Sequence, residues 1–460
     1  MTKETPARGR IRSGGAGGDV SPPGKTARAV IIVPVLTRLL KSTTDDQGRA
    51  RTARLPQARL EEAVGLAGAI DLDTVHSEIV TVNDPKPATL IGTGKLDELA
   101  GIVKETNAEL VFVDHPLTPV QQRNLEKTLN AKVLDRTGII LEIFGRRART
   151  REGTLQVDLA HLNYQKGRLV RSWTHLERQR GGAGFLGGPG ETQIEADRRI
   201  LLEKIVKLKR ELETVRRTRD LHRSKRRKVP YPIVAIVGYT NAGKSTLFNR
   251  MTGAGVLAED MLFATLDPTL RRVNLPHGTL VILSDTVGFI SDLPTHLVAA
   301  FRATLEEVVE ADLIIHLRDI SDPDTVAQSE DVHRILSDLG VDAEDDRRVL
   351  EVWNKVDLLT EADRAHLLEQ AGAQQPVAIS AISGEGVDRL AALVEERIAG
   401  VLSTIEVRLL PERASDIDWL YRNGEVLTRK DRDDGGIDLT IRATEAIRNE
   451  IAVRFGKDAG

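Results

Sequence analysis

The sequence predicts an α/β protein in which a P-loop domain follows a small α/β domain and a long antiparallel helical hairpin, with a short α/β domain at the C-terminus. Three observations predict this fold. Strand-like and helix-like segments alternate over residues 28–140, and a leucine seam of coiled-coil spacing follows them. A glycine-rich phosphate-binding pattern then begins at residue 238, directly after a short apolar strand.

Length and composition limit the class of protein. The chain has 460 residues, enough for about three domains, and it carries 65 Lys and Arg against 68 Asp and Glu. It contains no cysteine, which excludes disulfides, zinc ribbons and thiol catalysis and agrees with a reducing cytoplasm. The apolar run from Ala29 to Leu36 is too short to span a bilayer, and no signal-peptide pattern precedes it. We therefore expect a cytoplasmic protein without a membrane span.

The N-terminal part divides into an extension and a small domain. Residues 1–27 are rich in Gly, Ser, Pro, Arg and Lys, and we expect them to be disordered. Residues 28–140 read as a small α/β domain. Strands are expected at Val30–Val35, Glu78–Val82, Leu110–Val113 and Lys132–Leu134, and helices at Gln57–Ile70, Lys95–Glu105 and Thr118–Asn130.

A second glycine-rich string lies within this domain. Gly92-Thr93-Gly94-Lys95 looks like a phosphate loop, but it lacks the four-residue spacer and the trailing Ser or Thr. We favour a strand-to-helix turn here over a second phosphate site.

The hydrophobic period changes from Leu155, which predicts a helical hairpin over residues 141–229. Residues 181–190 hold six glycines, so they cannot be helical and are expected to form a flexible tip. On either side, apolar residues follow the spacing of coiled-coil seams, with Lys166 as one polar interruption. The seam residues are Leu155, Leu159, Leu162, Leu169, Trp173 and Leu176 on the first segment and Leu201, Ile205, Leu208, Leu212 and Val215 on the second.

The hairpin is strongly basic. Between Arg198 and Lys228 the chain carries fourteen Lys or Arg and four Asp or Glu, and a second basic cluster lies within residues 146–151. Most runs of charged residues are solvent-exposed faces without a partner, and this remains an alternative interpretation of the basic hairpin. The local excess on one element of an otherwise acidic chain nevertheless favours a polyanion such as RNA.

Residues 238–245 match the P-loop pattern G-x-x-x-x-G-K-[ST] at every position. The apolar run Pro232–Val237 supplies the strand before the loop, and a helix can open after it. Such a loop wraps backbone N–H groups around phosphates, directs its Lys to the β/γ oxygens and places its hydroxyl on Mg²⁺. The expected nucleotide-binding residues are Gly238, Tyr239, Thr240, Asn241, Ala242, Gly243, Lys244, Ser245 and Thr246.

The base is indicated by a string about 110 residues further on. Asn354, Lys355, Val356 and Asp357 follow the apolar run Val349–Trp353, at the strand end where open α/β sheets bind ligands. An aspartate there can accept hydrogen bonds from N1–H and the exocyclic amine of guanine, a donor pair that adenine lacks. The residues expected to lie against the base are Ser380, Ala381 and Ile382, which follow the strand Pro376–Ile379.

Two further strings complete the expected site. Asp285-Thr286-Val287-Gly288 follows the strand Thr279–Leu283, so Asp285 can hold Mg²⁺ through water and Gly288 can approach the γ-phosphate. Phe263-Ala264-Thr265-Leu266-Asp267 offers a hydroxyl to the Mg²⁺ shell. Lys244, Thr265 and Gly288 are expected to assist at the γ-phosphate. The set predicts a P-loop GTPase domain over residues 230–400, closed by a helix at Val387–Ile398.

The residue after Gly288 is Phe289, where small GTPases carry the glutamine that orients the attacking water. Phenylalanine cannot hydrogen-bond water, so we expect slow intrinsic hydrolysis that needs a partner or a rearrangement. The alternative is that another residue of this chain supplies the missing group, which the sequence does not identify.

The last 60 residues read as a short α/β domain over 401–460. Strands are expected at Val407–Leu410 and Gly436–Ile441, and helices at Ala414–Tyr421 and Glu445–Arg454. The sequence gives no indication of the function of this domain.

With these elements located, the chain resembles the HflX-type GTPases of the Obg-HflX group over about residues 30–400. The strings that carry the resemblance, besides the P-loop and residues 263–267, are Asp135-Arg136-Thr137, residues 146–153, Trp173-Thr174-His175-Leu176-Glu177-Arg178, and Gly190-Glu191-Thr192-Gln193 followed by Glu195 and Arg198-Arg199.

The resemblance implies a cytoplasmic, Mg²⁺-dependent GTPase that binds the large ribosomal subunit and its RNA and splits or rescues stalled ribosomes under stress. It also implies that Ser245 and Thr265 are metal ligands, that the glycine-rich tip reaches toward the peptidyl-transferase centre, and that a hydrophobic residue such as Phe289 is usual after Gly288. A monomer is expected. The alternative function is an RNA-binding or RNA-remodelling module in which GTP is only a conformational switch.

Overall fold

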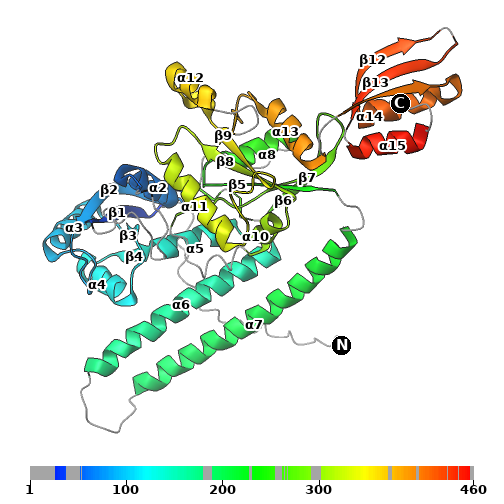
Figure 1. The fold of residues 1–460 in the computed structure, drawn as a ribbon. Coiled ribbons are helices and arrows are strands. Elements are labelled where there is room, and N and C mark those ends of the chain that lie inside the picture. Colours follow the sequence, from blue (N-terminus) through cyan, green and yellow to red (C-terminus); the bar gives the residue numbers. More distant parts are fainter. Residues whose placement is uncertain are drawn as a thin grey trace, which may run out of the picture.

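The computed structural model describes residues 26–37, 52, 54–179, 189–226, 231–253, 262–263, 265–266, 268–291, 302–370, 376–399, 403–432, 434–443 and 445–455. Most of the N-terminal extension, the glycines at 181–188, Ala264 and Asp267 lie outside these residues. Within them, three sheets and a helical hairpin follow one another along the chain, and the predicted α/β class is confirmed (Figure 1).

The N-terminal domain is a parallel four-stranded sheet in the order β2-β1-β3-β4, with helices on both faces. Helices α2 and α5 share one apolar cluster with one face, and α3 and α4 share another with the opposite face. The elements are β1 (Arg28–Leu36), α2 (Pro56–Gly68), β2 (Asp73–Val82), α3 (Thr93–Thr106), β3 (Leu110–Val113), α4 (Pro119–Leu129), β4 (Lys132–Asp135) and α5 (Arg136–Arg147). The predicted strands and three of these helices are thereby confirmed, but α5 was not predicted.

Helix α5 begins directly after β4, without a turn between them. Asp135 is the N-cap and accepts a hydrogen bond from the backbone N–H of Gly138 at 2.8 Å. The helix runs through residue 140, where the sequence analysis places a domain boundary. Gly92 takes the same capping position for α3, so the predicted turn at the second glycine-rich string is confirmed.

The hairpin consists of α6 (Arg151–Gln179) and α7 (Pro189–Arg226), which lie side by side and antiparallel as predicted (Figure 1). The prediction of a non-helical tip over residues 181–190 is wrong for Pro189 and Gly190, because α7 begins at Pro189, where a proline suits the first turn of a helix. Seam residues such as Leu155, Ile205 and Leu212 are buried. The hairpin is tied to the N-terminal domain because the Tyr164 hydroxyl and the Arg168 guanidinium both donate to the Asp135 carboxylate, at 2.5 and 2.9 Å. In the described part of the chain, no helix combines the length and apolar composition needed to cross a membrane.

The third unit is a six-stranded sheet in the order β10-β9-β8-β5-β7-β6, parallel except for β6. Helices α8 and α13 pack on one face, and α10 and α11 pack on the other. The strands are β5 (Ile233–Gly238), β6 (Thr269–Asn274), β7 (Leu280–Asp285), β8 (Leu313–Asp319), β9 (Val349–Asn354) and β10 (Val377–Ala378). The helices are α8 (Lys244–Thr252), α10 (Arg302–Val309), α11 (Thr325–Asp338), the short η2 (Val356–Leu358), α12 (Glu361–Gln370) and α13 (Val387–Ala399).

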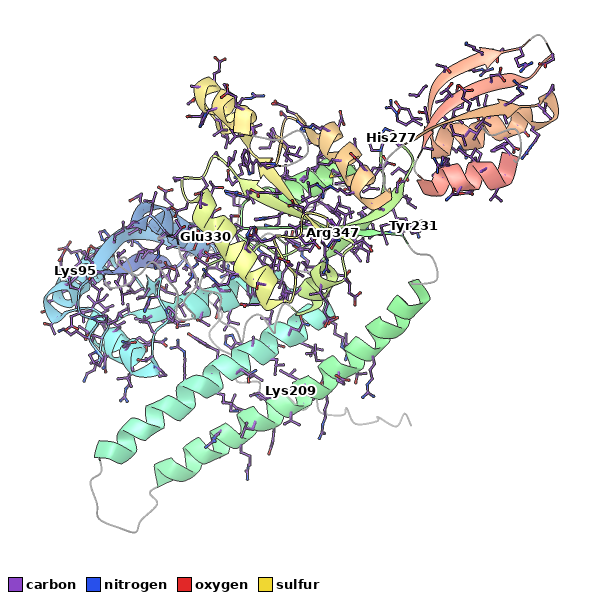
Figure 2. All side chains as sticks on the ribbon, viewed as in Figure 1. Lys95, Lys209, Tyr231, His277, Glu330 and Arg347 are labelled. Atoms are coloured by element: carbon purple, nitrogen blue, oxygen red, sulfur yellow. The ribbon has the colours of Figure 1, made fainter. Side chains whose placement is uncertain are left out.

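The C-terminal domain is an antiparallel sheet in the order β11-β13-β12 with its own apolar core. Its contact with the central sheet includes His277, in the β6–β7 turn, which lies 2.9 Å from Glu395 on α13 and 3.4 Å from Glu425 on β12 (labelled in Figure 2). The elements are β11 (Ser403–Leu409), η3 (Pro411–Asp416), α14 (Ile417–Asn423), β12 (Glu425–Asp431), β13 (Ile437–Ala443) and α15 (Glu445–Phe455). Strand β12 was not predicted.

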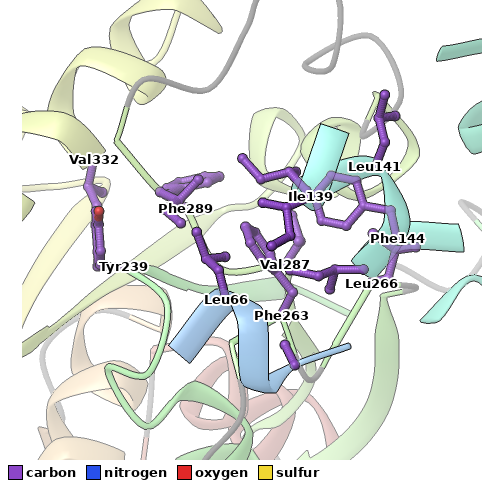
Figure 3. Close-up of a cluster of buried hydrophobic side chains, with 14 of the residues drawn as sticks. Leu66, Ile139, Leu141, Phe144, Tyr239, Phe263, Leu266, Val287, Phe289 and Val332 are labelled. Carbon is purple, nitrogen blue, oxygen red and sulfur yellow. The ribbon is translucent and has the colours of Figure 1, made fainter. Parts of the chain in front are cut away.

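One apolar cluster joins the N-terminal domain to the central sheet (Figure 3). Leu66 of α2 and Ile139 and Phe144 of α5 belong to it, together with Phe263 and Phe289 from the loops of the central domain. The rings of Phe144 and Phe263 meet edge to face, with centroids 4.9 Å apart. The two domains therefore share part of a core rather than touching only at their surfaces.

Replacing Phe144 with Ala should destabilise both domains, because its fully buried ring fills space between them. We expect a loss of about 3–5 kcal/mol in the free energy of unfolding, measured by urea denaturation. Val453→Ala is the control, since Val453 is 87% exposed and should change stability by less than about 0.5 kcal/mol. A loss at Phe144 no larger than at Val453 would contradict the shared core.

Candidate nucleotide-binding site

The P-loop connects β5 to α8 at the carboxyl edge of the central sheet. Helix α8 begins at Lys244, so the free N–H groups of its first turn face the end of the loop. Gly243 has a φ of +91°, and a Cβ there would strike the side-chain amide of Asn354. Glycine is therefore required at this position, as the pattern predicts.

Lys244 is buried, and its Nζ donates to the Tyr239 carbonyl oxygen at 2.7 Å. Burial lowers the pKa of Lys244 to about 8; the Asp285 carboxylate raises it, and Lys355 lowers it further. A phosphate group beside Nζ would supply the negative charge that favours the ammonium form.

Asn354, the last residue of β9, joins two neighbouring loops. Its Nδ2 donates to the Ala242 carbonyl at 2.8 Å, and its Oδ1 accepts from the Ala381 backbone N–H at 2.9 Å. Asp357 follows on η2 with its side chain exposed, and Ile382 is 69% exposed. The structure thus brings the P-loop, residues 354–357 and residues 380–382 together, as the sequence predicted.

Arg250 on α8 is a further residue of the site, which the sequence did not predict. Its Nε donates to the Ala381 carbonyl at 2.6 Å, and its Nη2 donates to the Ile382 carbonyl. The side chain thereby holds the loop predicted to lie against the base. A single arginine in a helix carries no sequence signal for this role.

Three side-chain oxygen groups converge where the sequence predicts Mg²⁺. The Ser245 hydroxyl lies 3.0 Å from the Thr265 hydroxyl, and both donate to the Asp285 carboxylate, at 2.8 and 2.9 Å. Burial raises the pKa of Asp285, against the hydrogen bond from Ser245 and the charge of Lys244.

These groups suit a hard divalent cation. The second carboxylate oxygen of Asp285 is buried and has no hydrogen-bond partner among the described residues, which fits an atom awaiting a metal-bound water. In the described part of the chain no group of three His, Cys, Asp or Glu could hold a metal. With two hydroxyls and one carboxylate here, a bound Mg²⁺ would take its remaining ligands from phosphate and water.

The loop after β7 is joined to the P-loop by backbone hydrogen bonds. Phe289 N–H donates to Gly238 O at 3.1 Å, and Thr240 N–H donates to Phe289 O at 2.8 Å. Gly288 precedes Phe289 in this loop. A Cβ on Gly288 would lie 2.9 Å from Thr240 Cγ2 and 3.1 Å from Lys244 Nζ. Gly288 is thus pressed against two residues of the P-loop.

Phe289 is 2% exposed and lies within the shared apolar cluster, with Leu66 and Val287 (Figure 3). Its ring packs in the core between domains, so it supplies no hydrogen bond to an attacking water. Phe263 and Leu266 belong to the same cluster, which gives these two predicted site residues a packing role. Thr286 and Val356 are also buried beneath the site.

Tyr239, the first variable residue of the P-loop, reaches out of the site into the N-terminal domain. Its hydroxyl donates to Glu62 of α2 at 2.5 Å and accepts hydrogen bonds from Arg54 at 2.8 Å and the Ser291 N–H at 3.0 Å. Burial and the Glu62 charge raise the pKa of Tyr239 well above its usual value. The P-loop is therefore fixed from outside the nucleotide-binding domain.

A buried ionic network surrounds this tyrosine. Arg136, at the start of α5, donates to Glu62 at 2.6 Å and to the Ser291 carbonyl at 3.0 Å, and it also pairs with Asp114 after β3. Arg54 pairs with Glu62 at 2.8 Å and with Asp324 before α11 at 3.2 Å. Each of these side chains is at most 8% exposed.

This network could not be predicted from the sequence, since its members come from distant parts of the chain and match no short motif. Arg136 lies in a string that indicates only the family resemblance.

The fold and these loops define a P-loop GTPase. Four family profiles match the chain: "GTP-binding GTPase N-terminal" over residues 57–145, "GTP-binding GTPase Middle Region" over 147–226, "50S ribosome-binding GTPase" over 233–355 and "HflX C-terminal domain" over 366–460.

The chain belongs to the HflX family of GTPases. It is 52% identical over 366 residues to GTPase HflX of Magnetococcus marinus, covering 80% of this chain and 83% of that protein. It is 43% identical over 383 residues to GTPase HflX of Escherichia coli, covering 83% and 89%. A GTP-binding protein of Sulfolobus solfataricus solved with GDP is 21% identical with a TM-score of 0.42 and covers 81% of this chain and 98% of that chain, a likeness too slight to carry an argument.

Glu62 should make the free energy of unfolding decrease at acid pH. Burial alone would raise its pKa, but Arg136 and Arg54 outweigh burial and lower the pKa to about 2 from 4.5. The folded state therefore binds fewer protons than the unfolded state between these pH values, so stability falls as the pH falls. We expect a loss of about 3 kcal/mol across this window, measured by urea denaturation at each pH.

Glu62→Gln should remove this component of the pH dependence. The variant should also be about 3–5 kcal/mol less stable at neutral pH, because two buried guanidinium groups lose their partner. Glu61→Gln, at the exposed neighbouring position on α2, is the control. An unchanged pH profile in Glu62→Gln would show that other carboxylates govern the acid transition.

Asp357→Asn should reduce the preference for guanine, because an amide replaces one hydrogen-bond acceptor with a donor. We expect the ratio of Kd values for XDP and GDP to shift toward XDP by about tenfold or more. Asp388→Asn, at an exposed site on α13, should leave the ratio unchanged. A variant that kept the wild-type ratio would refute the assignment of Asp357 to the base.

Proposed function

We propose that this protein binds the large ribosomal subunit, hydrolyses GTP there to GDP and phosphate, and in doing so splits or rescues stalled ribosomes in the cytoplasm. The observation that carries the proposal is the pairing of a GTP site with an exposed basic helix, α7, that precedes the P-loop strand in the chain. A monomer suffices for this arrangement.

In the proposed site each loop has one task. The P-loop backbone and Lys244 hold the β- and γ-phosphates, and Asp357 reads guanine while Ile382 covers the base. Ser245 and Thr265 would hold Mg²⁺ directly, and Asp285 would hold it through water. When bound, Mg²⁺ would neutralise charge on the β- and γ-phosphate oxygens.

The large subunit is proposed as the partner because α7 presents a basic surface. Its basic residues face solvent while Ile205 and Leu212 face α6. Such a surface suits the RNA backbone, and the profile that matches the central domain describes a 50S ribosome-binding GTPase. The exposed basic residues described in α7 are Arg198, Arg199, Lys204, Lys207, Lys209, Arg210 and Arg217.

Binding to the large subunit should depend on the γ-phosphate. We expect the protein to co-sediment with purified large subunits in a non-hydrolysable GTP analogue and to be largely lost in GDP, because a ligand shifts a conformational equilibrium only through differential affinity. Equal retention in both nucleotides would instead support the alternative, an RNA-binding module in which GTP is only a switch. No retention in either would refute the ribosomal proposal.

Charge reversal tests whether α7 makes the contact. Lys207→Glu combined with Arg210→Glu should weaken co-sedimentation and flatten its dependence on salt, since phosphate contacts release counterions. The matched control is Arg347→Glu combined with Arg422→Glu, the same charge change at side chains 91% and 79% exposed on other elements. Equal weakening by both pairs would point to overall charge rather than to α7.

A further inference from the structure

The proposed hydrolysis leaves one role without a residue, and the inference here rests on that proposed activity. A water molecule must be oriented toward the γ-phosphorus, and the usual glutamine position holds Phe289. Phe289 is buried in the apolar cluster, so it cannot take part. The missing group comes either from another residue of the site or from a partner.

Thr240, the second variable residue of the P-loop, carries an unused hydroxyl. The residue is 6% exposed, and Oγ1 has no hydrogen-bond partner among the residues that the structure describes. Leaving a buried hydroxyl unpaired costs roughly 1–3 kcal/mol, a cost that valine, of nearly the same shape, would avoid. A threonine here is therefore explained best by a partner that arrives with the nucleotide.

The backbone and the methyl group of Thr240 lie beside two residues of the proposed γ-phosphate site. Its Cα and Cγ2 lie 3.0 and 2.9 Å from where a Cβ on Gly288 would stand, and Lys244 Nζ lies 3.1 Å from the same point. Gly288 and Lys244 are the residues proposed to meet the γ-phosphate. Thr240 is thus a direct neighbour of both residues proposed to meet the γ-phosphate.

Thr240 is also held rigidly. Its backbone N–H is already bonded to Phe289 O at 2.8 Å, so only the side chain is left to donate to a ligand. The preceding Tyr239 is anchored by Glu62 and Ser291. A group fixed in this way orients a reactant without first losing conformational freedom.

We propose that the Thr240 hydroxyl positions the attacking water. The water donates a hydrogen bond to Oγ1, and the hydroxyl donates to a γ-phosphate oxygen, so that a lone pair on the water faces phosphorus. The water oxygen bonds to the γ-phosphorus while the bond from phosphorus to the β–γ bridging oxygen breaks and leaves its electrons on GDP. One proton of the water stays on the phosphate and the other passes to solvent, so that GTP⁴⁻ and H₂O give GDP³⁻, HPO₄²⁻ and H⁺.

The test compares Thr240→Val, which removes only the hydroxyl, with Thr240→Ser, which keeps it. We expect the single-turnover rate of GTP hydrolysis to fall about 10²-fold in Thr240→Val and to stay within about fivefold of wild type in Thr240→Ser. The Kd values for GDP and for a non-hydrolysable GTP analogue should change little, because the effect lies in the transition state. Rates are measured with and without large ribosomal subunits.

Two results would overturn the proposal. One is a wild-type rate in Thr240→Val, and the other is an equal fall in Thr240→Val and Thr240→Ser, which would mean a steric role. If Thr240→Val loses GDP binding, Thr240→Ala is compared with Thr240→Ser in its place. Thr252→Val is the control, since the Thr252 hydroxyl donates to Phe248 O within α8, at 2.7 Å, outside the site.

Failure of the proposed function is distinguishable from failure of this inference. A wild-type protein that hydrolyses no GTP, alone or with large subunits, removes the proposed function before any variant is compared. A wild-type protein that hydrolyses GTP but ignores the ribosome leaves the Thr240 comparison fully interpretable.

Discussion

The buried contact between the N-terminal domain and the P-loop is the constraint on which the rest of the structure depends. Arg54 and Arg136 are removed from water together with Glu62, Asp114 and Asp324. Buried charges of this kind are stable only when every one of them has its partner. The contact is therefore favourable when all the ion pairs are formed, and it is destabilising when one partner is missing. Such an interface favours two arrangements, with the N-terminal domain either fully docked on the P-loop or fully separated from it, over intermediate arrangements.

Because of the same contact, the geometry of the nucleotide site depends on the N-terminal domain as well as on the central domain. Tyr239 lies in the P-loop, yet its hydroxyl is bonded to α2, and Phe289 follows Gly288, yet its ring packs against α2 and α5. A displacement of the N-terminal domain would therefore shift both the P-loop and the loop after β7. This linkage gives a physical route by which events at the hairpin or the N-terminal domain can reach the nucleotide.

Local chemistry could be predicted from the sequence, and distant pairing could not. The P-loop and the strings at 285–288 and 354–357 were placed correctly at strand ends, because each needs particular residues at fixed spacing. Helix α5 was not predicted because Asp135 is both the last residue of β4 and the N-cap of α5. No turn residues separate the strand from the helix. Strand β12 was missed because its exposed, charged residues lack an apolar alternation.

The ionic network shows a different limit. Glu62, Arg136 and Tyr239 meet only after two sheets have formed and packed, so no short window of sequence contains them. Likewise, Thr240 could be predicted as a P-loop residue, but its unpaired hydroxyl became visible only once its neighbours had been placed.

The length of α7 has a mechanical consequence. A helix of 38 residues extends about 57 Å, and the chain from Arg226 to Ile233 can span at most about 25 Å, so one end of a long arm is tethered close to the P-loop strand. Rotation of such an arm by about 10° moves its far end by about 10 Å. A rotation of about 10° beside the nucleotide is thereby enough to withdraw the far end of the hairpin by about the width of a helix.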